Sequence, residues 1–145
     1  MGGILQYNTN YTSSSAFKKE KNFFLKNIFI LVGHKCEFKK VGDYKTIEIY
    51  GKSIVIYNFS KKISAFTNVC AHRGSSIFKE RFGNSLFKCP YHAWNYDENG
   101  NPKFIPLEKK ITNKKNIKMD FKLEEWKLEF CGEFIFLKSK KNKNN

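Results

Sequence analysis

Long apolar runs are missing from this chain of 145 residues. No stretch approaches the roughly 20 apolar residues that a membrane-spanning helix needs. The N-terminal residues 1–21 are polar and lack the apolar segment of a signal peptide. These two absences predict a cytoplasmic protein without a membrane partner.

Arginine is scarce although the chain is strongly basic. Of the 27 basic residues only Arg73 and Arg81 are arginines, and the formal net charge is +14. A nucleic-acid surface more often uses clustered arginine, whereas the lysines here are spread along the chain. The composition therefore favours solvated lysines, leaves open a basic docking face for an acidic partner, and argues against nucleic acid as a partner.

Cysteine and histidine are few, with four and three residues respectively. Cys36 and Cys131 lie far apart in the sequence, and we interpret them as free thiols in a reducing compartment. His34 stands alone, and we expect a structural or surface role for it. The other two cysteines and two histidines lie in two short motifs, Cys70-Ala-His72-Arg73-Gly74 and Cys89-Pro-Tyr91-His92-Ala-Trp94.

Apolar and aromatic residues are frequent enough for one folded domain with a real core, since apolar residues make up 41% of the chain. Alternating apolar residues and turn-forming pairs indicate antiparallel hairpins. Serines at 13–15 mark the start of the one predicted helix. We predict this helix over 12–27, strands over 29–32, 44–50, 53–57, 63–68, 126–130 and 133–137, and a lysine-rich surface loop over 108–118.

The two motifs combine two thiolates and two imidazoles in the pattern C-x-H and C-x-x-H, separated by sixteen residues. This is the ligand set of a Rieske [2Fe–2S] centre, in which two cysteines bind one iron and two histidines the other. Two ferric ions, two sulfides and two thiolates sum to zero charge, so such a centre accepts an electron more readily than one with four thiolates. A Cys₂His₂ zinc site is the alternative, although zinc fingers usually pair cysteine with cysteine and histidine with histidine.

The motifs and their surroundings resemble the Rieske domain of ring-hydroxylating oxygenase α subunits. The likeness includes the continuation of the second motif to Gly100, the upstream strands and the closing hairpin, and it covers about residues 10–138. It departs at Phe29 or Ile30, where the family usually has tryptophan. The resemblance implies a mainly β fold: a Rieske-type antiparallel β-sandwich with a small cluster-binding lobe of two loops and one short N-terminal helix. The expected divisions are a leader with the helix (1–21), the Rieske domain (22–138, with the lobe at about 68–106) and a polar basic tail (139–145).

The resemblance also implies roles for single residues. Cys70 and Cys89 would hold one iron of a [2Fe–2S] cluster, and His72 and His92 the other. Around them we expect Arg73 to brace its loop, Gly74 to allow a sharp backbone path, Trp94 to pack beside the cluster, and Tyr91 to lie beside it.

Two features of related respiratory Rieske proteins are missing. Ser75 and Tyr91 stand where those proteins have a disulfide, and Trp94 stands where they offer a serine hydroxyl to the cluster. Fewer hydrogen bonds to the cluster stabilise its reduced form less, so we predict a reduction potential of about −150 mV, at the low end of the Rieske range.

In the oxygenases a second domain binds a mononuclear iron through two histidines and one carboxylate. With two of its three histidines assigned to the cluster, this chain cannot complete such a site. We therefore expect an oxidoreductase component that takes single electrons from a reductase or ferredoxin and passes them to a mononuclear iron on another chain. Alternatives are a stand-alone Rieske ferredoxin-like carrier or redox sensor, a zinc-stabilised binding module, and a degenerate fragment of a longer gene.

Overall fold

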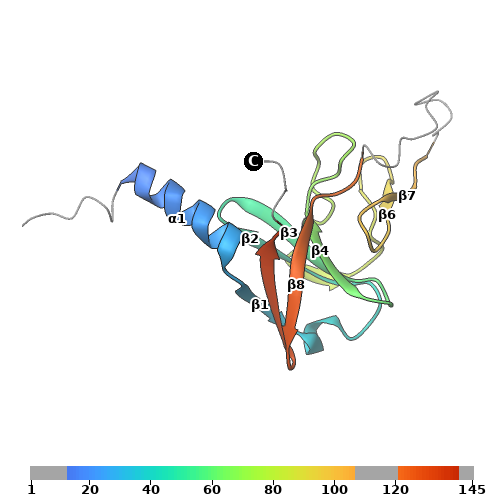
Figure 1. Ribbon diagram of the computed structural model, residues 1–145. Coiled ribbons are helices and arrows are strands. Elements are labelled where there is room, and N and C mark those ends of the chain that lie inside the picture. The colour runs from blue at the N-terminus through green and yellow to red at the C-terminus, as the bar shows by residue number, and fades with distance from the viewer. Residues whose placement is uncertain (1–12, 107–120, 141–145) are drawn as a thin grey trace, which may run out of the picture.

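The computed structural model describes residues 13–106 and 121–140 and shows one helix followed by an antiparallel sheet (Figure 1). Seven strands form one curled sheet in the order β1-β9-β8-β4-β3-β2-β5, and β6 and β7 form a separate hairpin. This confirms the predicted mainly β fold with one N-terminal helix. The elements are α1 (Ser14–Asn27), β1 (Ile30–His34), the 3₁₀ helix η2 (Lys35–Phe38), β2 (Asp43–Ile49), β3 (Lys52–Asn58), β4 (Ile63–Thr67), β5 (Phe82–Asn84), β6 (Asn95–Tyr96), β7 (Pro102–Phe104), β8 (Glu125–Cys131) and β9 (Phe134–Ser139).

Helix α1 begins where the serine run predicted it. The Ser13 hydroxyl accepts a hydrogen bond from the Ala16 N–H at 3.1 Å, which caps the first turn. Phe17 and Phe24 pack against the ring of Tyr50, at the end of the β2–β3 hairpin. These two aromatic contacts hold the helix against the sheet on the side away from β6 and β7 (Figure 1).

Strand β3 is buried on both faces, because the curled sheet has a packed layer on each side. Ile54 and Ile56 point into a core that β8 and β9 close with Trp126 and other apolar residues. Val55 and Tyr57, which alternate with them, belong to a second core shared with the segment 70–105. The sheet thus serves as a platform for that segment.

The hairpins match the predicted strands to within about two residues at each end. The turn chemistry that predicted them is local, so it identifies pairs of consecutive strands such as β2 with β3 and β8 with β9. The pairing of β1 with β9 joins strands from the two ends of the chain and was not predicted. The predicted surface loop 108–118 and the start of the helix at residue 12 lie outside the described residues.

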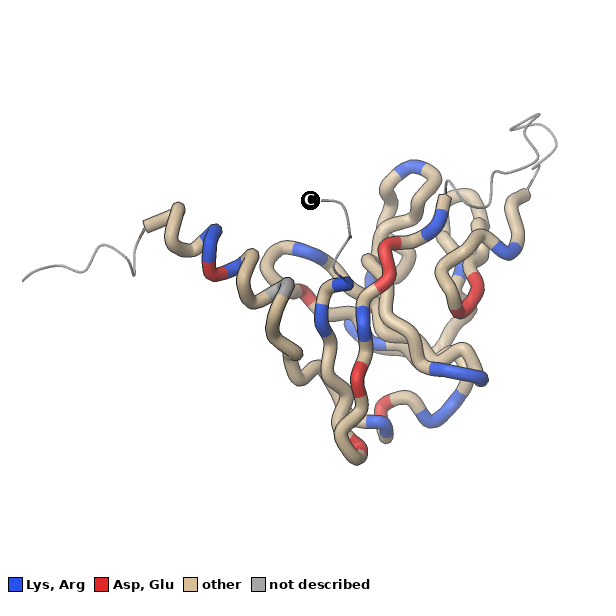
Figure 2. Tube along the Cα trace, viewed as in Figure 1, with Lys and Arg blue, Asp and Glu red and all other residues tan. Residues whose placement is uncertain are grey.

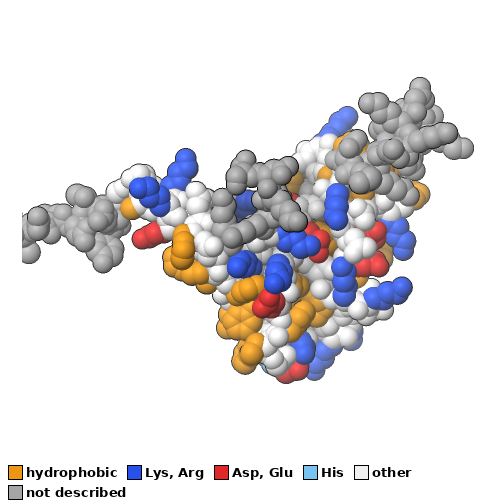
Figure 3. Space-filling model, viewed as in Figure 1, with side chains coloured by type: hydrophobic (Ala, Val, Ile, Leu, Met, Phe, Trp, Pro, Cys, Tyr) orange, Lys and Arg blue, Asp and Glu red, His pale blue; other side chains and the backbone are white. Residues whose placement is uncertain are grey.

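Basic residues are distributed over most elements (Figure 2). On the face shown in Figure 3, apolar side chains gather toward α1 and β1, and basic side chains spread over the rest. No helix in the described ranges is long and apolar enough to cross a membrane. Exposed apolar residues of α1, β1, β8 and β9 include Phe17, Phe23, Leu31, Phe130 and Phe134.

Candidate iron–sulfur site

The two motifs form loops with the same backbone hydrogen-bond frame. In the first, the Cys70 N–H donates to the carbonyl of Ser75, and the Gly74 N–H donates to the carbonyl of Cys70. In the second, the Cys89 N–H donates to the carbonyl of Trp94, and the Ala93 N–H donates to the carbonyl of Cys89. The donor and acceptor residues are separated by the same number of positions in both loops, although one motif is C-x-H and the other C-x-x-H.

The fourth residue after each cysteine has a left-handed backbone. Gly74 has a φ of +73° and Ala93 a φ of +56°, a conformation that costs a non-glycine residue about 1–2 kcal/mol. The role predicted for Gly74 therefore has a counterpart at Ala93, where alanine gave no signal in the sequence. Isolated bridges close both loops, one between Val69 and Ser76 and the other between Lys88 and Asn95.

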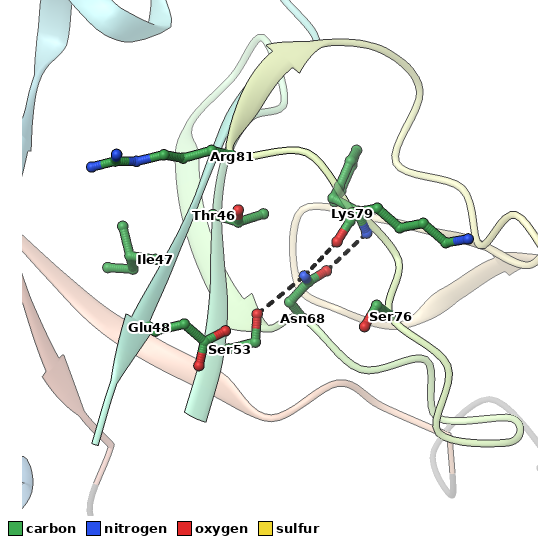
Figure 4. A pocket seen from close by; sticks show the side chains of 9 residues that line it. Thr46, Ile47, Glu48, Ser53, Asn68, Ser76, Lys79 and Arg81 are labelled. Carbon is green, nitrogen blue, oxygen red and sulfur yellow. Dashed lines mark hydrogen bonds between the residues drawn. The ribbon is translucent and has the colours of Figure 1, made fainter. Parts of the chain in front are cut away.

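Asn68 fastens the first loop to the sheet. Its side-chain amide donates to the Phe78 carbonyl at 2.8 Å and accepts from the Phe78 N–H at 2.9 Å, and it lies 3.3 Å from the Ser53 hydroxyl (Figure 4). Asn68 is only 2% exposed. It lies beside a hollow of about 790 Å³ at the edge of β2, where pairing with β5 ends at Lys45. Both ends of the segment 68–78 are thereby tied together without a disulfide.

The loops bring the four proposed ligands to one cavity of about 390 Å³. Cys70 and Cys89 are each 2% exposed, and their thiols lie close enough to shift each other's pKa. His72 is half-buried and His92 exposed, with ring centroids 4.8 Å apart. The arrangement is a buried pair of sulfurs beside a more exposed pair of imidazoles.

Each cysteine sulfur has a hydroxyl neighbour that the motifs did not reveal. The Tyr96 hydroxyl lies 3.1 Å from Cys70 Sγ and accepts from the Ala71 N–H at 3.1 Å, so its own proton is free for the sulfur. The Ser75 hydroxyl lies 3.4 Å from Cys89 Sγ. Tyr96 was visible only as part of the family-like continuation of the second motif, and no pattern pointed to Ser75 as a hydrogen-bond partner.

The electrostatics of the site separate the two thiols. Burial raises the pKa of Cys70 above its ordinary value despite the Tyr96 hydroxyl. Burial also acts to raise the pKa of Cys89, but hydrogen bonds from Ser75 and from backbone N–H groups outweigh it and lower that pKa. Burial, together with Cys70, raises the pKa of Tyr96 so far that its hydroxyl stays protonated.

The imidazole of His72 is held in its neutral form, the form that binds a metal. Burial lowers the pKa of His72, and the neighbouring His92 and Arg73 lower it further. Trp94 stacks on the His72 ring with centroids 4.7 Å apart and planes 4° from parallel, and it is only 1% exposed. The indole therefore fixes the orientation of one proposed ligand.

The remaining predicted residues differ in their surroundings. Arg73, Gly74 and Tyr91 line the cavity, and the Arg73 side chain makes no hydrogen bond or ion pair with the described residues. Cys36 and Cys131 are exposed free thiols away from the cavity. His34 accepts a hydrogen bond from the Cys36 N–H and caps η2, which is a structural role.

The four side chains have the composition that a two-iron cluster needs. In the part of the chain that the structure describes, no group of three or more His, Cys, Asp or Glu side chains is arranged to hold a metal ion. A cluster with two ligands on each iron instead needs two separate pairs. Two buried thiols and two outer imidazoles around one cavity provide those pairs.

This fold, with its two clasping loops, defines an iron–sulfur protein of the Rieske class. Residues 28–119 match the family model "Rieske [2Fe-2S] domain", and the chain belongs to that family. The cofactor of this domain family is a [2Fe–2S] cluster.

More particularly, the chain is similar to Rieske domains of oxygenases. It is 35% identical over 130 residues to the carnitine monooxygenase oxygenase subunit of Escherichia coli K12, covering 88% of this chain and 34% of that protein. It is 34% identical over 122 residues to the large oxygenase component of salicylate 5-hydroxylase from a Ralstonia species, covering 79% of this chain and 29% of that one. The chain thus spans about a third of the length of these relatives.

Solved structures agree with the sequence matches. The quaternary ammonium Rieske monooxygenase CntA superposes with a TM-score of 0.81 at 30% identity, covering 92% of this chain and 38% of that one. A naphthalene 1,2-dioxygenase variant bound to phenanthrene superposes with a TM-score of 0.77 at 27% identity, covering 89% and 30%. The curled sheet with its two loops is therefore the Rieske domain fold of these enzymes.

Proposed function

We propose that Cys70 and Cys89 bind one iron of the [2Fe–2S] cluster and that His72 and His92 bind the other. The observation that carries this assignment is the arrangement in two pairs around one cavity. The proposed lobe is the segment 68–106, within a Rieske domain of residues 22–138. The buried cysteines would hold the inner iron and the outer histidines the iron nearer to solvent.

The cluster, when bound, supplies one-electron redox chemistry at a potential set by its ligands and their hydrogen bonds. This chain's residues contribute the surroundings. Tyr96 and Ser75 direct hydroxyls at the sulfurs, Trp94 orients His72, and the core below the loops keeps water from the cysteine side. The exposed His92 leaves a short route for an electron to a partner.

The function that these features favour is electron transfer within an oxygenase system. The chain would accept single electrons from a reductase or ferredoxin and pass them to a mononuclear non-haem iron on another chain. Similarity to the oxygenase components supports this proposal. The third histidine, His34, lies in the cap of η2, so the described residues offer no second site with two histidines and a carboxylate.

The stand-alone carrier or redox sensor is the second candidate. It is favoured by the exposure of the site, because His92 and the neighbouring Tyr91, 73% exposed, are accessible in the described part of the chain. A carrier of this kind exchanges electrons with several proteins, whereas an oxygenase component needs one catalytic partner.

A potentiometric titration of anaerobically purified protein, followed by electron paramagnetic resonance, tests the assignment. We expect a one-electron signal of the mixed Cys/His type. Cys70→Ser and His92→Ala should abolish this signal, while Cys36→Ser and Cys131→Ser should retain it. Loss of the signal in Cys36→Ser would overturn the ligand assignment, and stoichiometric zinc in place of iron would refute the electron-transfer role.

A further inference from the structure

A further hollow lies directly behind the loop that carries Cys89 and His92. It is a groove of about 560 Å³, mainly apolar, between the segments 77–79 and 85–90. Pro90 lines this groove, while its chain neighbours Cys89 and Tyr91 line the cluster cavity. The backbone of the second loop is therefore the wall between the two spaces. The groove is lined by Tyr44, Ile77, Phe78, Lys79, Ser85, Leu86, Lys88 and Pro90.

The charged residues that line the groove are both cations. Lys79 and Lys88 line it, and none of the described residues lining it is acidic. Arg81 and Arg73 line the hollows on either side of it, and they are the only arginines in the chain. Glu48 also lines the hollow that holds Arg81, and Glu80 lies near Tyr44 of the groove. Cations therefore predominate around the groove, although acidic residues lie nearby.

These four cations take part in none of the described ion pairs, and the same holds for lysines elsewhere, such as Lys39 and Lys61. The described ion pairs join Lys35 to Glu133, Lys45 to Glu37, Lys52 to Glu124, Lys127 to Glu129 and Lys140 to Glu125, and all of them lie outside the segment 68–106. Lys79, Lys88, Arg73 and Arg81 have no ion-pair partner within the described residues. Unpaired charge around an apolar centre is the pattern of a surface that is completed by a partner of opposite charge.

An apolar anchor stands at the groove. Leu86 is 71% exposed, and it precedes Cys89 by three residues in the same loop. Burial of such a side chain in a partner adds affinity, while the surrounding cations guide the encounter and set its orientation. Cys89 is bonded directly to Lys88 and Pro90, which line the groove. A partner bound in the groove would therefore lie close to the cysteine side of the cluster.

We propose that this groove is the docking site for an acidic electron-donor protein, one that presents carboxylates around its own redox centre. Each encounter moves one electron: the donor's centre is oxidised by one electron, and the two-iron centre of this chain is reduced by one. The donor approaches from the cysteine side, which leaves His92 free for the acceptor. This inference rests on the proposed electron-transfer function and identifies the partner's surface chemistry.

The test compares two routes of reduction in the cluster-loaded protein. The donor probe is a reduced plant-type [2Fe–2S] ferredoxin, an acidic protein whose potential of about −400 mV drives the transfer. Photoreduced deazaflavin, a small neutral reductant, serves as the route that needs no docking. The variant Lys79→Glu/Lys88→Glu reverses the groove charges, and Lys18→Glu/Lys19→Glu makes the same change in net charge on α1.

We expect the groove variant to slow reduction by ferredoxin about tenfold or more at low salt, and to flatten the dependence of the rate on ionic strength. The α1 variant should change the rate by about twofold or less, and reduction by deazaflavin should be unchanged in both. Equal rates for the groove variant and the wild type would overturn the docking site while the proposed function stands. Failure of deazaflavin to reduce the wild-type protein would instead refute the proposed function.

Sedimentation of the wild-type protein at the same concentrations tests the competing occupant, a second copy of this chain. A monomer supports the proposal. A dimer that the groove variant dissociates would show that the groove is a self-association surface and would overturn it.

Discussion

Single hydroxyl groups at the site are expected to tune the cluster, because a hydrogen bond to a cysteine sulfur stabilises the more negative, reduced state. Removing the Tyr96 hydroxyl, 3.1 Å from Cys70 Sγ, should therefore lower the reduction potential. A differential stabilisation of about 1 kcal/mol corresponds to about 40 mV for one electron. We expect Tyr96→Phe to lower the midpoint by about this amount, and Ser75→Ala, at the longer distance of 3.4 Å, by less.

The measurement is a potentiometric titration monitored by the visible spectrum of the cluster. Phe104→Leu, a change at an exposed side chain of β7, is the control and should leave the midpoint within error of the wild type. A midpoint for Tyr96→Phe equal to or above the wild-type value would contradict the role of this hydroxyl.

These two contacts also show how far residue-level prediction reached. The cysteines and histidines were predicted because their spacing has few other uses, and the structure brings all four to one cavity. Ser75 and Tyr96 contact the sulfurs through folding, at positions where serine and tyrosine are ordinary residues. The predicted potential of about −150 mV took into account that Trp94 offers no hydroxyl to the cluster. It did not include the hydroxyls of Tyr96 and Ser75, which raise the potential.

Gly100 is a further residue whose importance is set by its surroundings. Its φ is +80°, and a Cβ atom there would lie 2.6 Å from the ring of Phe66, which is fully buried. We expect Gly100→Ala to reduce the free energy of unfolding by about 3 kcal/mol or more, because backbone strain and a core clash combine. Denaturant unfolding of the cluster-loaded protein measures this loss in the free energy of unfolding.

Gly51→Ala is the matched control, because Gly51 has a φ of +77° but an added Cβ there would meet no other atom within 4 Å. It should cost only the strain of the left-handed backbone, about 1 kcal/mol. Equal losses in the two variants would show that the contact with Phe66 is relieved without cost.

At the scale of elements, the first ligand loop depends on Asn68. Its amide satisfies both the N–H and the carbonyl of Phe78 in a buried setting, so Asn68→Ala leaves two buried backbone groups without partners. We expect a loss of about 2–4 kcal/mol in the free energy of unfolding and faster loss of the cluster to an iron chelator. Bleaching of the visible absorption after chelator addition measures the second effect.

Asn84→Ala provides the comparison, since Asn84 bonds to the Val41 carbonyl and the Asp43 carboxylate at an exposed position. It should change cluster release little. An Asn68→Ala protein that releases iron as slowly as the wild type would mean that the loop keeps its shape through other contacts.

The elements themselves were predictable where the signals were local. Serines marked the cap of α1, and the glycine turns at Gly51 and Gly132 marked the β2–β3 and β8–β9 hairpins. The pairing of β1 with β9 could not be predicted from the sequence, because the apolar pattern of a strand does not indicate which distant strand it pairs with. The common frame of the two loops was also hidden, since its defining bonds use backbone groups and its left-handed positions are Gly74 in one loop and Ala93 in the other.

At the scale of the whole molecule, the formal net charge of +14 opposes folding. The oxidised cluster with its two thiolates is neutral and leaves this charge unchanged. Surface ion pairs such as Lys35 with Glu133 contribute little, whereas repulsion among unpaired lysines acts on the entire compact state. Added salt screens this repulsion, and screening becomes effective at about 0.1 M, where the Debye length falls to about 10 Å.

We therefore expect the melting temperature of the cluster-loaded protein to rise by several degrees as sodium chloride increases from about 20 mM to about 300 mM. In Lys18→Glu/Lys19→Glu each substitution removes two units of positive charge, which lowers the net charge from +14 to +10 and should reduce the rise. Differential scanning calorimetry under anaerobic conditions measures both proteins. A melting temperature that falls with salt would mean that attractive ion pairs outweigh the repulsion. In that case the charged side chains of this chain would be arranged to stabilise the fold despite the high net charge.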